Sequence, residues 1–143
     1  MDPTVTLGAA PIVLVVDDDE DLLAVLRDVI EEEGYRVSTA CDGEAALALL
    51  EADETPCMIL LDLKMPGMDG GEFRRRQLAN PRLAAIPVVG FTGLWNGEET
   101  AHRLALASCL RKPVNLHKLL ETVAHYCSDP DHLDVSRPSS ATG

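Results

Sequence analysis

An apolar run that ends in a single acid constrains this chain more than any other feature. Residues Met58 to Leu61 are all apolar, Asp62 follows them, and Pro66 and Gly67 come soon after. Such a run is typical of a strand covered on both faces, as in a parallel sheet, and Pro-Gly turns the chain away from it. Asp62 is therefore expected at the carboxyl edge of a buried strand. Open α/β sheets bind ligands at that edge, so we favour a functional role for this acid over a loop cap.

A second apolar run, Ile12 to Val16, ends on the acids Asp17, Asp18 and Asp19. If the two strands are neighbours, several carboxylates converge on one point. Two unit charges about 4 Å apart repel by about 4 kcal/mol at an effective dielectric near 20. The cluster must therefore take up protons or a divalent cation, and ligands that are all oxygen favour Mg²⁺.

Other roles compete for the same acids. Asp19 or Glu20 is expected to cap the following helix or to complement its dipole, because an acid at its start interacts favourably with the first free backbone N–H groups. The spacing of Asp17, Asp19 and Asp21 also resembles the start of a calcium loop. We reject that interpretation, since Leu22 stands where the loop requires glycine.

The length, charge and hydropathy of the chain exclude several classes of protein. The chain has 143 residues, 46% of them hydrophobic, which suits one compact domain. A formal net charge of −12 argues against direct nucleic-acid binding, which needs a basic face. No stretch approaches the roughly 20 apolar residues of a membrane span, and the N-terminus lacks a secretory pattern. We expect a cytoplasmic protein without membrane insertion.

The four cysteines are expected to be reduced thiols in the interior. They show no C-x-x-C spacing, and two of them lie in apolar segments. That distribution favours buried thiols over disulfides or a zinc site. The residues concerned are Cys41, Cys57, Cys109 and Cys127.

Apolar periodicity predicts strands that alternate with helices. Strands are expected at 12–16, 35–40, 58–62, 86–91 and 109–111. Helices are expected after each strand, the third at about 70–80 and the fourth at about 96–107. Residues 1–10 are expected to form a flexible arm, 11–127 the domain, and 128–143 a disordered tail or linker.

This alternation predicts an α/β fold, a doubly wound parallel sheet of five strands with helices on both faces. In the flavodoxin-like strand order 2-1-3-4-5, strands one and three lie side by side at the point where the winding reverses. That order would bring Asp17, Asp18 and Asp62 together.

Four short motifs resemble those of the receiver domain of two-component response regulators, including the stand-alone regulators of chemotaxis. The resemblance covers about residues 12–127, with the motifs in the family's order. They are Val-Val-Asp-Asp-Asp at 15–19, Leu-Leu-Asp-Leu-Lys-Met-Pro-Gly-Met-Asp-Gly at 60–70, Phe-Thr-Gly at 91–93 and Leu-Arg-Lys-Pro at 110–113.

The resemblance implies a phosphoacceptor switch, and we favour a stand-alone response regulator or a phosphorelay intermediate. Asp62 would accept a phosphoryl group from a histidine kinase or a histidine phosphotransfer protein, and the altered domain would control a downstream protein of unknown identity. The Mg²⁺ ligands would be Asp17, Asp18, Asp62 and the backbone carbonyl of Lys64. The phosphoryl oxygens would contact Thr92 and Lys112. Family precedent also implies a cis peptide bond before Pro113.

The chain departs from the family pattern at two positions. Receiver domains usually carry Tyr or Phe three residues before the site lysine, and here that position is Cys109. Readout by a swinging ring is therefore in question, and we expect the loop from Thr92 to Gly97 to carry it, with Trp95 as its reporter. Ala105 stands where a glycine is common, which affects only the local turn.

Two further interpretations remain open. The chain could be a receiver excised from a hybrid histidine kinase or a larger regulator. A less favoured alternative is a Mg²⁺-dependent aspartyl-phosphate hydrolase, which would need an acid two residues after the nucleophile, where this chain has Lys64. The run Arg74, Arg75 and Arg76 is expected to form a solvated helix face, and the histidines to be exposed.

Overall fold

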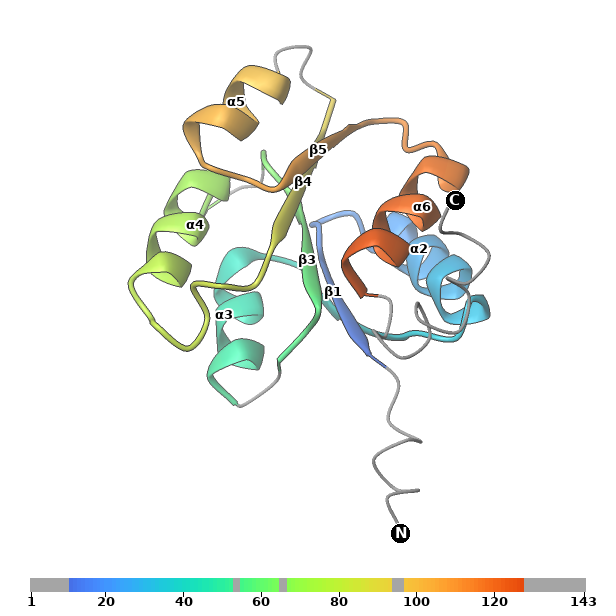
Figure 1. The fold of residues 1–143 in the computed structure, drawn as a ribbon, viewed down its shortest axis with the longest axis horizontal. Coiled ribbons are helices and arrows are strands. Elements are labelled where there is room, and N and C mark those ends of the chain that lie inside the picture. Colours follow the sequence, from blue (N-terminus) through green and yellow to red (C-terminus); the bar gives the residue numbers. More distant parts are fainter. Residues whose placement is uncertain (1–10, 53–54, 65–66, 94–96, 128–143) are drawn as a thin grey trace, which may run out of the picture.

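A computed structural model describes residues 11–52, 55–64, 67–93 and 97–127. The remaining segments are drawn as a thin grey trace in Figure 1. The predicted arm at 1–10, the predicted tail at 128–143 and Trp95 therefore lie outside the described residues.

A parallel sheet of five strands forms the centre of the fold, in the order β2-β1-β3-β4-β5. This is the doubly wound, flavodoxin-like order that the sequence predicted. Neighbouring strands are parallel throughout. The strands are β1 (Ile12–Val16), β2 (Arg36–Ala40), β3 (Met58–Asp62), β4 (Val88–Thr92) and β5 (Ser108–Arg111).

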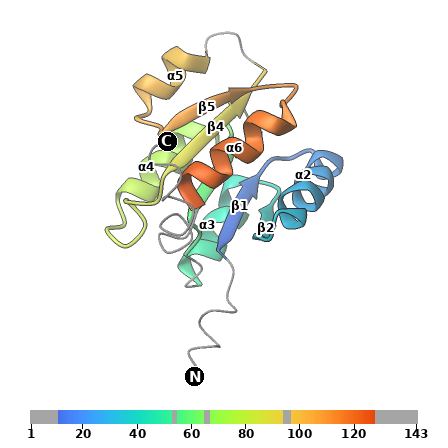
Figure 2. The ribbon, with the colours of Figure 1, turned by 45° about the vertical axis from the view of Figure 1, so that its right-hand side comes forward.

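Helices connect the strands and cover both faces of the sheet (Figure 1). Helices α2 and α6 lie on one face, and α3 and α4 lie on the other, as the turned view in Figure 2 also shows. The helices are α2 (Glu20–Glu32), α3 (Gly43–Glu51), α4 (Gly70–Leu78), α5 (Gly97–Arg103) and α6 (Leu116–Cys127).

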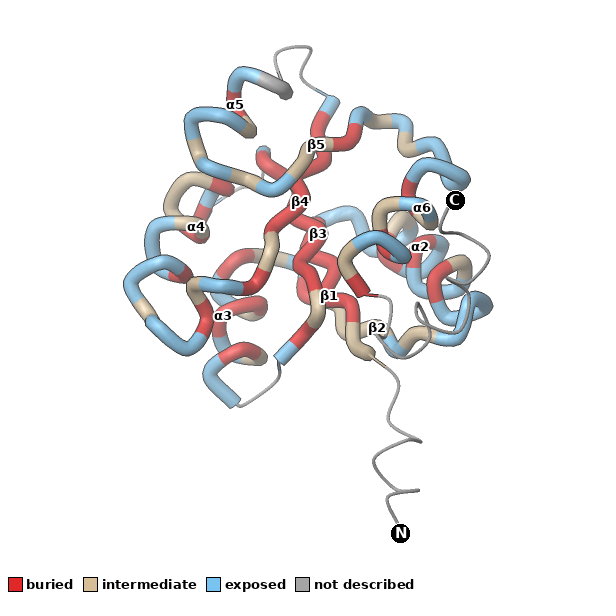
Figure 3. Tube along the Cα trace, viewed as in Figure 1, coloured by how far each residue is buried: buried red, intermediate tan, exposed pale blue. Residues whose placement is uncertain are grey.

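The core is divided into two layers by the sheet. One layer packs α3 and α4 against the sheet around Phe73, and the other packs α2 and α6 around Phe91. Every residue of β3 is buried, as expected for an unbroken apolar run. Figure 3 shows the buried sheet at the centre and exposed outer faces on the helices.

Aspartates cap three of the helices at their amino ends. Asp19, Asp42 and Asp69 accept hydrogen bonds from backbone N–H groups in the first turns of α2, α3 and α4. Each such cap stabilises a helix by about 1 kcal/mol relative to alanine. Of the two candidates for the start of α2, Asp19 is the cap and Glu20 lies in the first turn.

Helix α5 is shorter than its predicted span of about 96–107, because the chain adopts a left-handed conformation just beyond it. Ala105 has φ of +56°. That conformation ends the helix, and the N–H of Leu106 turns back to the carbonyl of Ala101 at 2.9 Å. Ala105 thus occupies a turn position at which glycine is the usual residue.

The three consecutive arginines of α4 do not share one environment. Arg75 and Arg76 are exposed, as predicted, but Arg74 is half-buried and the prediction is wrong for it. Its guanidinium donates to the carbonyl of Leu104 at 3.0 Å and to that of Ala105 at 2.7 Å. Arg74 therefore ties α4 to the turn after α5.

The prediction of reduced, buried cysteines is wrong in two respects, the pairing of two residues and the burial of a third. Cys57 and Cys127 form a disulfide, with their Cα atoms 5.2 Å apart. Cys41 and Cys109 remain thiols, and Cys41 is exposed rather than buried. Sequence spacing gave no sign of this pair, because it forms where α6 returns across the sheet to the start of β3.

None of the described helices combines the length and apolar character needed to cross a membrane.

Candidate functional site

A cleft of about 430 Å³ opens at the carboxyl edge of the sheet. Loops that follow β1, β3, β4 and β5 surround it, so residues distant in the chain share one space. Its lining consists of Asp17, Asp18, Asp19, Asp62, Lys64, Thr92, Gly93 and Lys112. All six site residues implied by the family resemblance are among them.

Three carboxylates meet in this cleft. One oxygen from each of Asp17, Asp18 and Asp62 lies within 4.8 Å of the others. Their convergence follows from strand register, because Val16 of β1 pairs with Leu61 of β3 and the next residue of each strand is the acid. Asp17 and Asp62 are buried, whereas Asp18 is exposed.

Lys112 supplies a positive charge to the two buried acids. Its Nζ lies 2.9 Å from Oδ2 of Asp17 and 3.3 Å from Oδ2 of Asp62. The Lys112 N–H also donates to the carbonyl of Thr92, which fixes the end of β5 beside β4. The peptide bond between Lys112 and Pro113 is cis, as the family resemblance implied.

Burial, hydrogen bonds and neighbouring charges together shift the pKa values of Asp62 and Lys112. Burial raises the pKa of Asp62 above its ordinary value, aided by the charge of Asp17, while the Lys64 N–H and Lys112 oppose the rise. Burial alone would lower the pKa of Lys112, but hydrogen bonds and charge from the two acids outweigh it, so the pKa is raised. The ammonium form is thus favoured.

Thr92 and Lys64 line the cleft with Asp62, Thr92 from the end of β4 and Lys64 from the loop that follows Asp62. Thr92 ends β4 and is only 2% exposed, and Gly93 after it has open space where a Cβ would stand. The backbone N–H of Lys64 donates to Oδ1 of Asp62 at 3.1 Å, while its side chain faces solvent. Asp62 is therefore oriented by its own loop.

The donor set fits a divalent cation of the hard, oxygen-binding kind. Three carboxylates and one ammonium leave two formal negative charges in a partly buried cleft. Carboxylate oxygens are preferred ligands of Mg²⁺, and a small cation would offset the repulsion between Asp17 and Asp62. The residues present are compatible with a metal site.

An aromatic ring under the lysine was not part of the predicted site. Nζ of Lys112 lies 4.8 Å from the ring centroid of Phe91, a fully buried residue of β4. Such a contact stabilises a cation by about 0.5–2 kcal/mol. The alternation of β4 gave no signal for it, because the contact depends on the path of the lysine side chain.

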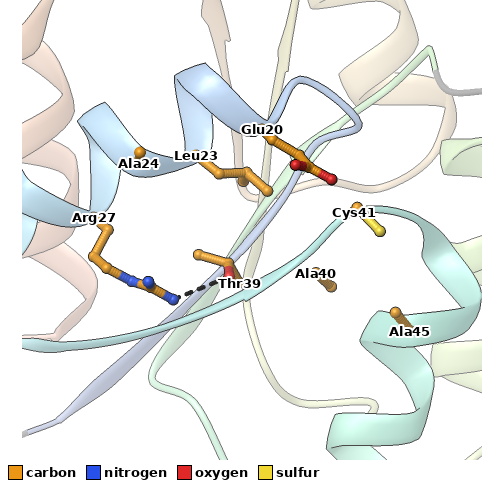
Figure 4. Close-up of a pocket in the computed structure, with 8 residues that line it drawn as sticks. All are labelled: Glu20, Leu23, Ala24, Arg27, Thr39, Ala40, Cys41 and Ala45. Atoms are coloured by element: carbon orange, nitrogen blue, oxygen red, sulfur yellow. Dashed lines mark hydrogen bonds between the residues drawn. The ribbon is translucent and has the colours of Figure 1, made fainter.

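A second hollow lies between α2 and β2 (Figure 4), with a volume of about 390 Å³. Its charged lining residues are Glu20 and Arg27, and Arg27 donates to Oγ1 of Thr39 at 3.1 Å. The thiol of Cys41 stands at its rim. With a single acid in its lining, this hollow does not reproduce the carboxylate cluster of the cleft.

Fold and site together define the class of protein. A doubly wound sheet whose carboxyl edge gathers three acids and a lysine is typical of phosphoacceptor signalling modules. A family model described as "Response regulator receiver domain" matches residues 13–124. The chain belongs to this family, whose members are signalling switches of two-component systems rather than enzymes acting on a separate substrate.

Individual relatives support the same assignment. The chain is 37% identical over 117 residues to an uncharacterised 14.6 kDa protein of Leptolyngbya boryana, covering 80% of this chain and 88% of that protein. It is 46% identical over 82 residues to the response regulator PleD of Caulobacter vibrioides, covering 57% of this chain but only 18% of PleD. The structure of the chemotaxis protein CheY4 of Vibrio cholerae matches with a TM-score of 0.75 and 28% identity, covering 82% of this chain and 99% of CheY4.

Proposed function

We propose that residues 11–127 form a receiver domain in which Asp62 accepts a phosphoryl group from a histidine kinase or a histidine phosphotransfer protein. The domain then changes conformation and controls a downstream protein. Asp17, Asp18, Asp62 and the carbonyl of Lys64 hold Mg²⁺, and Thr92 and Lys112 contact the phosphoryl oxygens. We place this reaction in the cytoplasm.

The observation that carries the proposal is the joint position of Asp62 and Lys112. Asp62 is 4% exposed, and Nζ of Lys112 stands 3.3 Å from its Oδ2 at the base of an open cleft. A carboxylate attacks a charged phosphoryl group slowly unless positive charge faces the transferred oxygens. Lys112 provides that charge, and bound Mg²⁺ would neutralise further charge on the same oxygens.

For the phosphoryl transfer itself, the protein needs to supply little beyond the correct position of Asp62 and positive charge near the transferred oxygens. One oxygen of Asp62 forms a bond to phosphorus while the bond from phosphorus to the donor's imidazole nitrogen breaks. The imidazole leaves with the bonding electrons, so the phosphoryl group moves without net loss of bonds. The Lys64 N–H holds the other carboxylate oxygen and so fixes the direction of attack.

Phosphorylation would alter the loop that begins at Thr92. The added group carries about −1.5 to −2 charges and offers three strong acceptor oxygens. A hydroxyl close to Asp62 can donate to one of them, which would draw Thr92 and the start of the α5 connection toward the cleft. The proposed reporter Trp95 lies outside the described residues, so its response stays a prediction.

Labelling by acetyl phosphate tests the proposal. Asp62→Asn keeps the side-chain shape but removes the nucleophile, so Mg²⁺-dependent label on the full chain should vanish. Lys112→Ala should slow labelling by roughly 100-fold, because one preorganised charge facing the transferred group is lost.

The matched control is Asp69→Asn. Asp69 is exposed and caps α4 through the Glu72 N–H, and asparagine caps a helix about equally well. Its labelling should equal that of wild type. Label that persists at the wild-type level in Asp62→Asn would place the acceptor elsewhere and contradict the proposal.

A longer parent protein is the alternative that a specific observation favours. The match to PleD covers only 18% of that protein, so domains of this kind also occur within larger regulators. Sequencing the complete reading frame distinguishes the alternatives. An additional domain in the same frame would make this chain the receiver part of a larger regulator or hybrid kinase.

A further inference from the structure

Two cysteines separated by 70 positions are joined at the amino edge of the sheet. Cys57 directly precedes β3, and Cys127 is the last residue of α6. The acidic cleft lies at the other edge, where β3 ends on Asp62. The cross-link therefore acts on α6 and not on the acids.

The same packing also suits the reduced residues. Sγ of Cys57 lies 3.3 Å from the carbonyl oxygen of Ile12, so a thiol at that position would have an acceptor for its hydrogen. Cys127 is 4% exposed and belongs to the apolar layer between α6 and the sheet, where a thiol behaves as a small apolar group. Opening the bond is thus compatible with the fold.

The two sulfurs differ in accessibility. Cys57 is half-buried, whereas Cys127 is buried. Thiol–disulfide exchange needs an approach to one sulfur along the S–S bond, and that approach is easier at Cys57. Exchange with a small thiol or disulfide therefore begins at Cys57, with Cys127 as the second participant.

The bond is the strongest described restraint on the last turn of α6. Leu119 and Val123 are fully buried and fix the first two thirds of the helix. In the last turn, the Tyr126 hydroxyl donates to the carbonyl of Ala107 at 3.4 Å, which is long for a hydrogen bond between oxygens. Opening the disulfide would remove the covalent restraint and leave this turn to the non-covalent packing of Cys127 and Tyr126 against the core.

We propose that Cys57 and Cys127 form a reversible thiol–disulfide exchange site, through which small disulfides such as oxidised glutathione lock the last turn of α6 against the start of β3. Small thiols release it. This control is additional to phosphorylation and does not depend on Asp62.

The exchange is balanced in atoms and electrons. The Cys57 thiolate attacks one sulfur of oxidised glutathione, and one glutathione leaves as a thiolate that takes up a proton. Cys127 then displaces the second glutathione from the mixed disulfide. Two protein thiols are oxidised while one glutathione disulfide is reduced to two thiols.

Thiol counting on the full chain tests the proposal. The protein is equilibrated with reduced and oxidised glutathione at graded ratios, trapped with N-ethylmaleimide and weighed by mass spectrometry. The count should rise from two labelled cysteines to four in a single two-electron transition, with circular dichroism unchanged. Amide exchange in residues 124–127 should accelerate at least tenfold on reduction, while that of β3 stays constant.

Matched variants separate the site from the other cysteines. Cys57→Ser and Cys127→Ser should show fast exchange in the last turn of α6 at every glutathione ratio. Cys41→Ser should retain the wild-type transition. If a serine variant does not fold, the wild-type titration decides alone, because it is read on the native protein.

Three results would overturn the proposal. The bond could stay closed in reduced glutathione until the chain is unfolded, which would make it a permanent cross-link. The thiols could stay open in oxidised glutathione, or amide exchange in α6 could be equal in both states. Because none of these measurements uses phosphorylation, they leave the phosphoacceptor proposal untouched.

Discussion

At the scale of single residues, the buried position of Asp62 makes its charged form unfavourable. It is 4% exposed and shares the cleft with Asp17, and burial first, then that neighbouring acid, raises its pKa. The folded chain therefore binds the Asp62 proton more tightly than the unfolded chain does. Stability must fall as pH rises from about 3.8 through the raised pKa of the folded state.

Asp62→Asn should remove that pH-dependent loss. Without divalent cations, the variant is expected to be more stable than wild type at pH 7, and the difference should become small at about pH 3, below the ordinary value of 3.8, where the acid is mostly protonated in both states. Each unit of pKa elevation is worth about 1.4 kcal/mol. Urea unfolding in EDTA at the two pH values measures the difference, with Asp69→Asn as control. If Asp62→Asn is less stable than wild type at pH 7, the prediction is contradicted. That result would show that the ion pair with Lys112 stabilises the folded state by more than the burial of the Asp62 charge destabilises it.

At the scale of elements, the turn after α5 depends on an arginine from another helix. Arg74→Met keeps the apolar stem but removes donors to the carbonyls of Leu104 and Ala105. The loss should destabilise the fold by about 1–3 kcal/mol, because two hydrogen bonds from a charged donor are lost and one of the two acceptors, the carbonyl of Leu104, is partly buried. Chemical denaturation measures this cost.

Arg75→Met is the matched control on the same helix. Arg75 is exposed and, among the described residues, forms its ion pair with Glu72, so its loss should change stability by no more than about 0.5 kcal/mol. Equal losses in the two variants would mean that the contacts of Arg74 contribute nothing measurable.

The same turn contains a conformational cost that a glycine would relieve. Ala105 adopts φ of +56°, which is unfavourable for any residue with a Cβ. Ala105→Gly should raise stability by about 0.5–1 kcal/mol, after the greater freedom of glycine in the unfolded chain is taken into account. Ala101→Gly, inside α5, should lower stability by a similar amount. If Ala105→Gly and Ala101→Gly changed the stability in the same direction, this account would be contradicted.

At the scale of the whole molecule, a divalent cation should stabilise the fold. Mg²⁺ at ten times its dissociation constant adds about 1.4 kcal/mol if it binds only the folded chain. Thermal unfolding with and without Mg²⁺ should show a higher midpoint in wild type. Asp18→Asn should reduce the shift, since one of the three carboxylates is lost. An unchanged midpoint in saturating Mg²⁺ would argue against a cation site.

The sequence predicted the architecture because its signals were local and agreed with one another. Apolar runs of four or five residues that end at an acid define β1 and β3, and shorter apolar segments before Thr92 and Lys112 place the ends of β4 and β5. Parallel connections then leave few possible strand orders. The clustering of Asp17, Asp62 and Lys112 follows from that order, and the structure brings them together.

The failures concern contacts that no local pattern encodes. The position of Arg74 in a run of three arginines suggested a solvated face, yet it alone points toward the turn after α5. Cys57 and Cys127 carry no spacing signal, because their proximity depends on the length and angle of α6. Both features arise from packing between elements rather than from the pattern within one.

The ion pair between Asp17 and Lys112 joins residues 95 positions apart, near the two ends of the described fold. Synthesis on the ribosome proceeds from the amino end, so a nascent chain carries Asp17, Asp18 and Asp62 long before Lys112 has been made. Until β5 has emerged and closed that long loop, the carboxylates lack their counter-charge. A fragment that stops before β5 therefore holds every acid of the cleft but lacks the lysine that pairs with Asp17 and Asp62, so the complete set of charges exists only in chains extended through Lys112.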